Sequence, residues 1–410
     1  MTPHAVMEVA SEAVLESDVV ASSASWRDTM RRIAVEVAGP NADAADRSGT
    51  FPSPTFAALR RDGMLGLMVP RSLGGQELGL RTIADVCAVL AGACGASGMI
   101  YAMHQIKLSS LVAHGMQTEY HRALMRDVAA KQLLIASSTT EAGIGGDLRI
   151  SNCAIETAGD RVSLTKQASV LSYATEADII MATARRSPAS VGSDQVLIAL
   201  RRDDYRLQRT AEWNTLGMRA TCSEGFLLTA TAGADQIFPK PFHEIAVQSM
   251  LATAHVLWAS VWFGIATDAL SRAHASVRAT ARRMPSDFTG PLPGAARLAE
   301  ATAKLQTFKS TLVAHIERFE TAKRNEDDLS SINFAIEMNN LKVMASTMAV
   351  DVVREALMVT GIAGYRNDGP FSVGRHLRDV LSAPLMVAND RILANTAVLV
   401  VASRFDSDLE

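Results

Sequence analysis

The local pattern of the chain changes twice, from helical to strand-like near residue 133 and back to helical near residue 243. In the first part, apolar residues recur at helical steps, as at Trp26, Met30, Ile33 and Val37. In the middle, short aliphatic and β-branched runs alternate with polar or glycine-containing turns, which is typical of a compact β-domain. The last part again carries helical stripes, now long ones. This order excludes a Rossmann-type enzyme, in which strands and helices alternate throughout, and a coiled-coil scaffold, which needs no β insert.

The sequence therefore predicts a short tail followed by three domains. They are an N-terminal tail at 1–22, an N-terminal helical domain at 23–132, a middle β-domain at 133–242 and a C-terminal helical bundle at 243–410. The first helix is predicted to end at Gly39-Pro40, because glycine and proline commonly stop helices. The small residues between Ala91 and Gly98 predict a close helix approach or a helix break.

Composition narrows the possible partners and location. The chain has 410 residues and a formal net charge of −3, which gives no reason to expect nucleic acid or an anionic membrane surface as a partner. No run reaches the about 18 uninterrupted apolar residues of a membrane span, and the N-terminus does not resemble a secretory signal. Four scattered cysteines, none clustered with histidines, predict reduced thiols, a cytoplasmic location and no metal site.

One loop, Thr139-Thr-Glu-Ala-Gly-Ile-Gly-Gly-Asp147, is the strongest local indication of a ligand. It follows an apolar run and combines three glycines with two hydroxyl groups. Glycines let backbone N–H groups approach a ligand, and hydroxyls can bond to a ring edge or a phosphate. On its own, the same pattern also fits an ordinary glycine-rich turn.

Five segments, taken in order, resemble segments of the acyl-CoA dehydrogenase superfamily. They are Val69–Gly75 (V-P-x-x-x-G-G), Thr140–Asp147 (T-E-P-x-A-G-S-D), Ala177–Arg185, Trp213–Thr221 (W-x-T-L-G-M-R-x-T), and Gly361–Tyr365 with Gly374–Asp379. The chain is therefore identified as a member of that superfamily. The resemblance implies a mainly α fold with a central β-barrel or sandwich, a C-terminal four-helix bundle, a bound FAD and a homotetramer or homodimer.

The resemblance also implies roles for individual residues. The expected cofactor-binding residues are Ser138, Thr139, Thr140, Gly145, Gly146, Ser172, Gly361, Gly364 and Asn389. Ser172 takes the place of a threonine whose hydroxyl bonds flavin N5, where a donor is expected because N5 accepts the hydride. Gly361 and Gly364 would approach the cofactor of a neighbouring subunit. Trp213 and Met218 are expected to determine the fold, and Arg378-Asp379 is expected to be a structural ion pair.

The chain departs from the family at the catalytic base. Val387 stands where the usual glutamate belongs, and Ala254 aligns with the alternative base position. Removing an α-proton from a thioester needs a base with a pKa near the working pH, within hydrogen-bond reach. His255 and His104 are the candidate replacements, whereas Asp390 is expected to face another way as a first-turn acid.

Two flavin-dependent reactions remain open. The first is dehydrogenation of an acyl thioester, bound to coenzyme A or a carrier protein. A hydride would pass from the β-carbon to N5, and an electron-transfer flavoprotein would accept the electrons of the reduced flavin. The second is a two-component monooxygenase that takes reduced flavin, FAD or FMN, from a separate reductase. The missing glutamate and Val170 in place of a flavin-facing tryptophan favour the second, whereas the lack of a histidine after Asp379 argues against it. The flavin loop and the L-G-M-R-x-T segment are closer to those of dehydrogenases, so the sequence predicts the first reaction and keeps the second as the alternative. A non-catalytic scaffold is a third possibility, but the glycine-rich loop has little use without a ligand.

Overall fold

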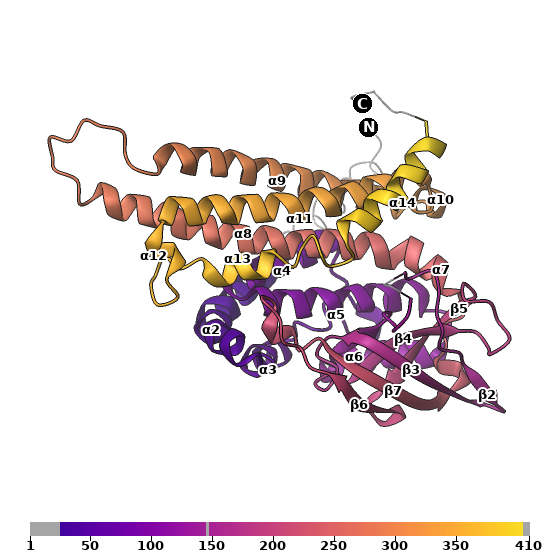
Figure 1. Cartoon of the computed structure of the whole chain (residues 1–410). Helices are drawn as coiled ribbons and strands as arrows, with labels where there is room; N and C mark the ends of the chain where they lie inside the picture. Colours follow the sequence, from indigo (N-terminus) through magenta and orange to yellow (C-terminus); the bar gives the residue numbers. More distant parts are fainter. Residues whose placement is uncertain (1–24, 145–146, 405–410) are drawn as a thin grey trace, which may run out of the picture.

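The computed structural model describes residues 25–144 and 147–404. The predicted tail at 1–22 and the expected cofactor-binding residues Gly145 and Gly146 lie outside the described residues. The fold is mainly helical with a central β-domain, as predicted. Long C-terminal helices form one layer, and the β-domain and the N-terminal helices lie on the same side of that layer (Figure 1).

The first domain packs its helices around one buried helix, α5. Its elements are a helix at 25–33, η1 (Ala34–Ala38), α2 (Gly39–Ser48), α3 (Ser53–Arg61), η2 (Arg71–Leu73), α4 (Leu80–Ala93), α5 (Gly95–His114) and α6 (Glu119–Lys131). In α5, 17 of 20 residues are buried, so this helix has no solvent face and serves as the centre of the fold. It lies between the C-terminal helices and the β-domain (Figure 1).

The prediction that the first helix ends at Gly39-Pro40 is wrong. The Gly39 N–H donates to the Ala34 carbonyl, which forms a π-helical turn, and the helix continues to Ser48. Proline has no N–H to donate, so a local change of hydrogen-bond register can accommodate Pro40 without breaking the helix. The helix ends instead at Gly49, whose φ of 63° is the usual left-handed stop.

The β-domain consists of two small sheets. Its strands are β1 (Ile135–Ser138), β2 (Glu156–Ala158), β3 (Arg161–Leu171), β4 (Ile179–Arg185), β5 (Gln195–Arg201), β6 (Tyr205–Ala211) and β7 (Glu224–Gly233). One sheet has the order β1-β4-β5 and the other β2-β3-β7-β6, and only β1 and β4 pair in parallel among these neighbours. The aliphatic and β-branched runs at 133–138, 162–166, 178–185, 195–200 and 225–232 became strands. Strands β2 and β6 were missed because most of their residues are exposed and polar or small.

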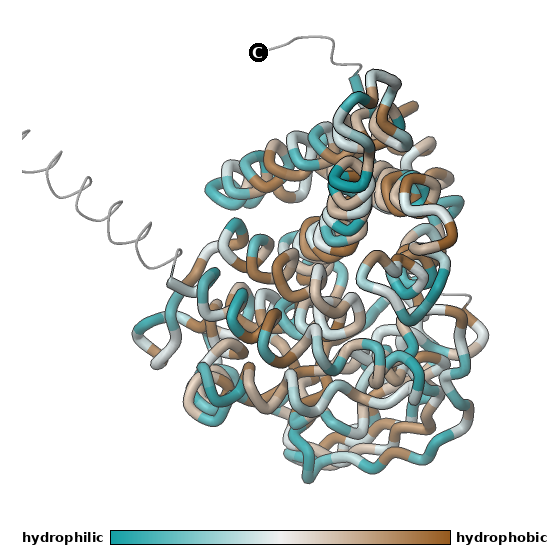
Figure 2. The backbone as a smooth tube through the Cα atoms, turned by 90° about the vertical axis from the view of Figure 1, so that its left-hand side faces the viewer, coloured by the Kyte–Doolittle hydropathy of each residue, from teal (hydrophilic) through white to brown (hydrophobic). Residues whose placement is uncertain are grey.

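The last part forms the helical layer that covers α4 and α5. Its elements are α7 (Phe242–Ile245), η6 (Ala246–Met250), α8 (Leu251–Ala281), α9 (Ala295–Ala322), α10 (Glu326–Leu329), α11 (Ile332–Thr360), α12 (Ile362–Tyr365), α13 (Gly374–Val380) and α14 (Asn389–Ala402). Helices α8, α9 and α11 run side by side, and α14 packs on α11 (Figure 1). Hydrophobic segments gather where the helices face one another, as Figure 2 shows.

Helix α8 is the core helix of this layer. The stretch Phe242–Ala281 is long and apolar enough to cross a membrane, but 78% of its apolar window is buried inside the protein. It packs closely on α4, since a Cβ atom at Gly264 would lie 2.1 Å from the Ala88 carbonyl oxygen. Residues that would suit a membrane are therefore used for helix packing here.

Candidate functional site

A cavity of about 710 Å³ lies where the β-domain, α5, α8 and the segment before α14 meet. Much of its wall is apolar, with Met99 and Met103 from α5 and Trp258 from α8. The β-domain side adds hydroxyl groups, from Ser137, Thr139, Thr140, Ser172, Thr221 and Ser223. Apolar walls with a few converging polar groups are the usual construction of a small-molecule site.

Two predicted flavin-binding residues meet at this wall. Thr140 follows β1 and donates through Oγ1 to the Val170 carbonyl, at 2.6 Å. Ser172 follows β3 and its Oγ lies 2.7 Å from Ser223 Oγ. Both hydroxyls are therefore held in place by the β-domain while their side chains line the cavity.

Glu141 anchors the predicted flavin loop from inside. Its buried carboxylate accepts the Cys153 N–H at 2.6 Å and the Ser151 hydroxyl at 2.8 Å. The Lys166 ammonium lies 3.8 Å from the same carboxylate. Glu141 is thus a structural residue that fixes where Thr140 stands, and it does not line the cavity.

The segment Trp213–Thr221 forms a turn that is held from both sides. Met218 has a φ of 50°, its N–H donates to the Asp379 carboxylate at 2.7 Å, and its carbonyl accepts from Trp213 Nε1 at 3.0 Å. The same carbonyl accepts from Thr221 Oγ1 at 2.8 Å. Burial raises the pKa of Asp379 to about 6, although Arg375 nearby lowers it. These contacts give Trp213, Met218 and Thr221 a structural role, because they fix one wall of the cavity.

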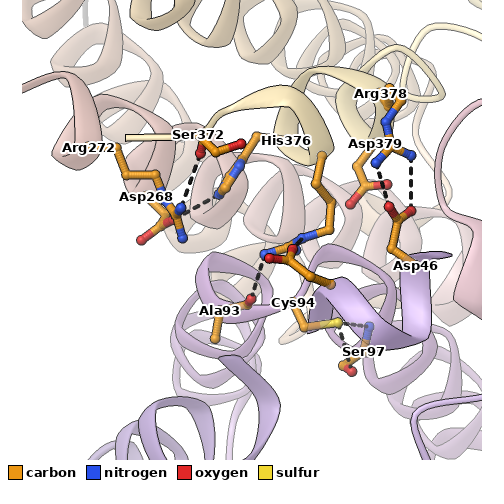
Figure 3. Close-up of polar contacts among 12 residues, drawn as sticks. Asp46, Ala93, Cys94, Ser97, Asp268, Arg272, Ser372, His376, Arg378 and Asp379 are labelled. Carbon is orange, nitrogen blue, oxygen red and sulfur yellow. Dashed lines mark hydrogen bonds and ion pairs between the residues drawn. The ribbon is translucent and has the colours of Figure 1, made fainter. Parts of the chain in front are cut away.

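Arg378 and Asp379 do not act as a pair with each other. Arg378 forms its ion pair with Asp46 of α2, where Nη1 lies 3.0 Å from Oδ1 and Nη2 also bonds Oδ2 (Figure 3). Arg378 also donates to the Leu216 carbonyl at 3.0 Å. The predicted ion pair between Arg378 and Asp379 is therefore wrong. Adjacent residues bind different partners here because successive helical side chains point in different directions.

Both base positions of the family line the cavity, and both carry alkyl side chains. Val387 and Ala254 contribute to the wall, and no aspartate or glutamate lines it among the described residues. Val387 has a φ of 48°, a strained conformation for a β-branched residue. Lys342 holds this segment, because its ammonium donates to the Val387 carbonyl at 3.1 Å and to Asn389 Oδ1 at 2.7 Å.

The two candidate histidines lie in different environments. His255 lines the cavity, and its Nδ1 lies 2.9 Å from the Met338 carbonyl, so Nδ1 carries the proton and Nε2 keeps its lone pair. Burial lowers the pKa of His255 to about 4. His104 does not line the cavity: Nε2 donates to the Leu65 carbonyl at 2.8 Å and Nδ1 accepts the Ile135 N–H at 3.0 Å. His104 therefore connects core segments.

The other predicted residues lie outside the cavity wall. Ser138 is fully buried, while its neighbours Ser137 and Thr139 line the wall, because alternate residues of a strand face opposite sides. The Asn389 side chain bonds Lys342 and Ser346 and so fastens α14 to α11. Asp390 is exposed in the first turn of α14.

Gly361 directly precedes α12, and Gly364 lies within it. Gly361 is exposed and has a φ of 56°, whereas Gly364 is buried against Thr360. Neither lines the cavity of this chain. Their predicted contact with the cofactor of a neighbouring subunit stays a prediction.

Sequence reasoning missed several polar residues of the wall. Thr221 is the last residue of a segment already matched to the family, so its neighbour Ser223 could have been examined with it. Lys107 also lines the cavity, and a lysine in a helix without any other Lys, Arg, Asp or Glu is the signal that could have found it. Arg391, at the start of α14, is a further cation on the wall.

The cavity fits a flavin. The ring needs apolar faces and polar partners at its edge, which Trp213, Met218 and the hydroxyls of Thr140 and Ser172 can supply. Within residues 25–144 and 147–404 no group of three or more His, Cys, Asp or Glu is placed to hold a metal ion. The fold and this site define a flavin-dependent oxidoreductase.

Comparisons with known proteins agree with that class. Residues 22–132 match the acyl-CoA dehydrogenase N-terminal domain and residues 245–396 match the C-terminal domain. The chain therefore belongs to the acyl-CoA dehydrogenase family.

Individual relatives include enzymes of more than one reaction type. The chain is 24% identical over 369 residues to cyclohex-1-ene-1-carbonyl-CoA dehydrogenase of Geobacter metallireducens, covering 89% of this chain and 94% of that protein. It is 26% identical over 360 residues to the amino sugar nitrososynthase DnmZ of Streptomyces peucetius, covering 83% and 84%. The crystal structure of FMN-bound TdsC from Paenibacillus sp. A11-2 superposes with a TM-score of 0.80 at 18% identity, covering 93% of this chain and 98% of that one. This last likeness is one of fold.

Proposed function

We propose that the chain is a monooxygenase that uses reduced flavin and molecular oxygen. The observation that carries the proposal is the cavity wall without a carboxylate among its described residues, with Val387 and Ala254 at the two base positions of the family. A dehydrogenase must remove an α-proton, and an alkyl side chain cannot. A monooxygenase needs no such base: reduced flavin gives two electrons, one oxygen atom enters the substrate and the other leaves as water.

Several relatives support this direction. TdsC is described as a dibenzothiophene monooxygenase, and MsuC of Pseudomonas fluorescens, which has the same fold, as a methanesulfinate monooxygenase. FMN is bound in structures of TdsC and, for this reason, FMN supplied by a separate flavin reductase is the proposed cofactor here. FAD fits the same proposal.

The chain's own residues would bind and orient the reactants. A bound flavin supplies the reducing electrons and the site of oxygen activation. Thr140 and Ser172 would hold the polar edge of its ring, and Trp213 with Met218 would cover a face. The apolar wall from α5 and α8 offers water few hydrogen-bond partners, which would limit its access to the reacting atoms.

Dehydrogenation of an acyl thioester is the second candidate, and His255 favours it. Its Nε2 has a lone pair, no described residue is hydrogen bonded to that atom, and the residue directly follows the alternative base position at Ala254. Its pKa of about 4 makes it a weak base. In that case the cofactor would be FAD and the electron acceptor an electron-transfer flavoprotein.

The proposed protein is a cytoplasmic oligomer. We propose a homotetramer or homodimer, with Gly361 and Gly364 near a neighbouring subunit. All four cysteines are free thiols, which supports the predicted cytoplasmic location. The substrate is a small molecule.

Two measurements on the purified protein separate the candidate reactions. Under anaerobic conditions, a series of acyl-CoA thioesters is added to the FAD-loaded protein while the flavin absorbance is followed. Separately, the protein with reduced FMN is mixed rapidly with oxygenated buffer. The proposal expects no bleaching in the first case and, in the second, a transient absorbance band distinct from both oxidised and free reduced flavin. Bleaching by any thioester, without the transient band, would overturn it in favour of dehydrogenation.

A further inference from the structure

Lys107 is a buried lysine whose ammonium has no oxygen acceptor among the residues that the structure describes. It lies on α5, is 2% exposed, and lines the cavity beside Met103 and Ile106. Its ammonium lies 3.0 Å from Met250 Sδ. A thioether sulfur is only a weak acceptor. Across the described parts of the chain, no carboxylate, carbonyl or hydroxyl oxygen accepts a hydrogen bond from Lys107.

The other fully buried lysines, Lys166 and Lys342, have oxygen acceptors. Lys166 donates to the Thr183 carbonyl at 2.7 Å and its hydroxyl at 3.0 Å, with Glu141 at 3.8 Å. Lys342 donates to the Val387 carbonyl and to Asn389. Burying a cation is unfavourable unless oxygen acceptors replace the lost water. The fold provides such acceptors for two lysines and leaves the one that faces the cavity without them.

We infer that the substrate of this cavity is a small, largely apolar molecule with one anionic oxygen group, which pairs with Lys107. The inference rests on the proposed function in taking the cavity as the substrate site. The apolar side chains next to Lys107 on α5 suit the body of such a molecule, and the ammonium suits a carboxylate or phenolate oxygen. A plain alkyl chain would leave the ammonium against methyl groups.

The protonation of Lys107 agrees with this assignment. Burial, with a smaller contribution from Lys166, lowers its pKa to about 7. Near neutral pH, a fraction of the protein molecules therefore carries Lys107 as an uncharged amine, which lowers the cost of burying this side chain in the free site. An anion beside the nitrogen restores the charged form, so that ligand and lysine form an ion pair where neither is exposed to water.

The test compares acids with neutral amides of the same shape. Affinities of the full-length, FMN-loaded protein are measured by isothermal titration calorimetry for acetate and acetamide, hexanoate and hexanamide, benzoate and benzamide, and cinnamate and cinnamamide. The variants are Lys107→Met, which keeps the length of the side chain, and Lys131→Met, a matched change at an exposed lysine of α6. Arg391→Met removes another cation of the cavity wall.

The inference expects wild type and Lys131→Met to bind at least one acid about tenfold or more tightly than its amide. Lys107→Met should lose that preference while still binding the amide. No preference for the acid in any pair, or a preference that persists in Lys107→Met, would overturn the inference. Loss of the preference in Arg391→Met alone would also overturn it, since the anion would then bind at α14.

The binding test can succeed even where the proposed monooxygenase function fails. Binding is measured without turnover, so an acid preference that depends on Lys107 can stand even if the protein with reduced flavin gives no transient band with oxygen. Melting temperatures of the variants, measured alongside, identify any change that comes from misfolding. A buried lysine replaced by an apolar residue of similar length is expected to fold.

Discussion

Ser172 Oγ lies 2.7 Å from Ser223 Oγ, at the outer end of a chain of hydroxyl groups with a fixed direction. Ser223 Oγ lies 2.7 Å from Thr221 Oγ1, and Thr221 donates to the Met218 carbonyl at 2.8 Å. Because a carbonyl only accepts, Thr221 uses its hydrogen there, Ser223 donates to Thr221, and Ser172 donates to Ser223. Ser172 therefore presents lone pairs to the cavity, and not the donor that the sequence led us to expect.

This direction predicts a preference for reduced flavin. Reduced flavin carries a hydrogen at N5 and can donate to Ser172, whereas oxidised flavin offers an acceptor there. Ser223→Ala breaks the chain and lets the Ser172 hydroxyl turn, so the ratio of the affinities for reduced and oxidised FMN should fall about three- to tenfold. Anaerobic fluorescence titrations with both forms of FMN measure that ratio.

Ser137→Ala is the control for this change, since it removes a cavity hydroxyl outside the chain. It should leave the ratio within about twofold of wild type. An unchanged ratio in Ser223→Ala, or an equal drop in the control, would show that the hydroxyl chain does not set the preference.

Lys342 is expected to stabilise the segment that carries Val387. Lys342→Met removes the donor to the Val387 carbonyl and to Asn389, which should lower the free energy of unfolding by about 2 kcal/mol. Urea denaturation measures this change. Lys304→Met removes a surface ion pair with Glu300 and should change stability by less than about 0.5 kcal/mol. Equal effects in the two variants would refute the stabilising role of Lys342.

The left-handed backbone at Val387 is expected to cost stability. Asparagine tolerates a φ of 48° better than a β-branched residue, so Val387→Asn should raise the free energy of unfolding by about 1 kcal/mol. Leu385→Asn, at an exposed neighbour, should not raise it. Thermal melts of both variants check the prediction, and a destabilised Val387→Asn would mean that packing at this position outweighs the strain.

Mild acid should destabilise the fold through four buried histidines. Burial lowers the pKa of each to about 4, and they are His104, His114, His121 and His255. Above about pH 6.5 these histidines are neutral in both the folded and the unfolded state. Between about pH 6.5 and pH 4 they are protonated in the unfolded chain but remain neutral in the folded one. Stability is therefore present at neutral pH and is lost as the pH falls between these values.

Asp379 works in the opposite direction. Its pKa of about 6 in the folded state makes folding more favourable as the pH falls from about 6 towards its ordinary value near 4. The four histidines and Asp379 together take up about three protons on unfolding near pH 5. The free energy of unfolding should therefore fall by about 4 kcal/mol for each pH unit of acidification there. Urea denaturation between pH 5 and 7 measures the slope, and His255→Gln should reduce it by about one proton. A flat profile would contradict the neutral, buried state of these side chains.

The local sequence pattern predicted most helices and strands, but not the hydrogen-bond register within the first helix. Short aliphatic and β-branched runs identified five strands, and helical stripes identified the long helices, because buried strands and helix faces both require apolar side chains. Pro40 could not be placed correctly, since a π-helical turn depends on the register of backbone hydrogen bonds and leaves no mark in composition.

The site shows the same limit at the level of single residues. Thr140, Ser172 and His255 were named from segments that resemble those of a known family, and all three line the cavity. Ser138 was chosen one residue away from Ser137, since the facing side of a short strand is set by its tertiary neighbours. Lys107 was missed because its significance lies in the partners that it lacks, which only the packed structure reveals.

The contact between Asp46 and Arg378, described above as a structural ion pair, joins residues 332 positions apart. Met218 and Asp379 are likewise bonded across 161 positions. During synthesis, the wall formed by Trp213–Thr221 must therefore wait for α13 to leave the ribosome before it can close. The binding cavity should be among the last parts of the protein to form, and chains truncated before residue 379 should lack the contact that fixes the Met218 turn in its wall.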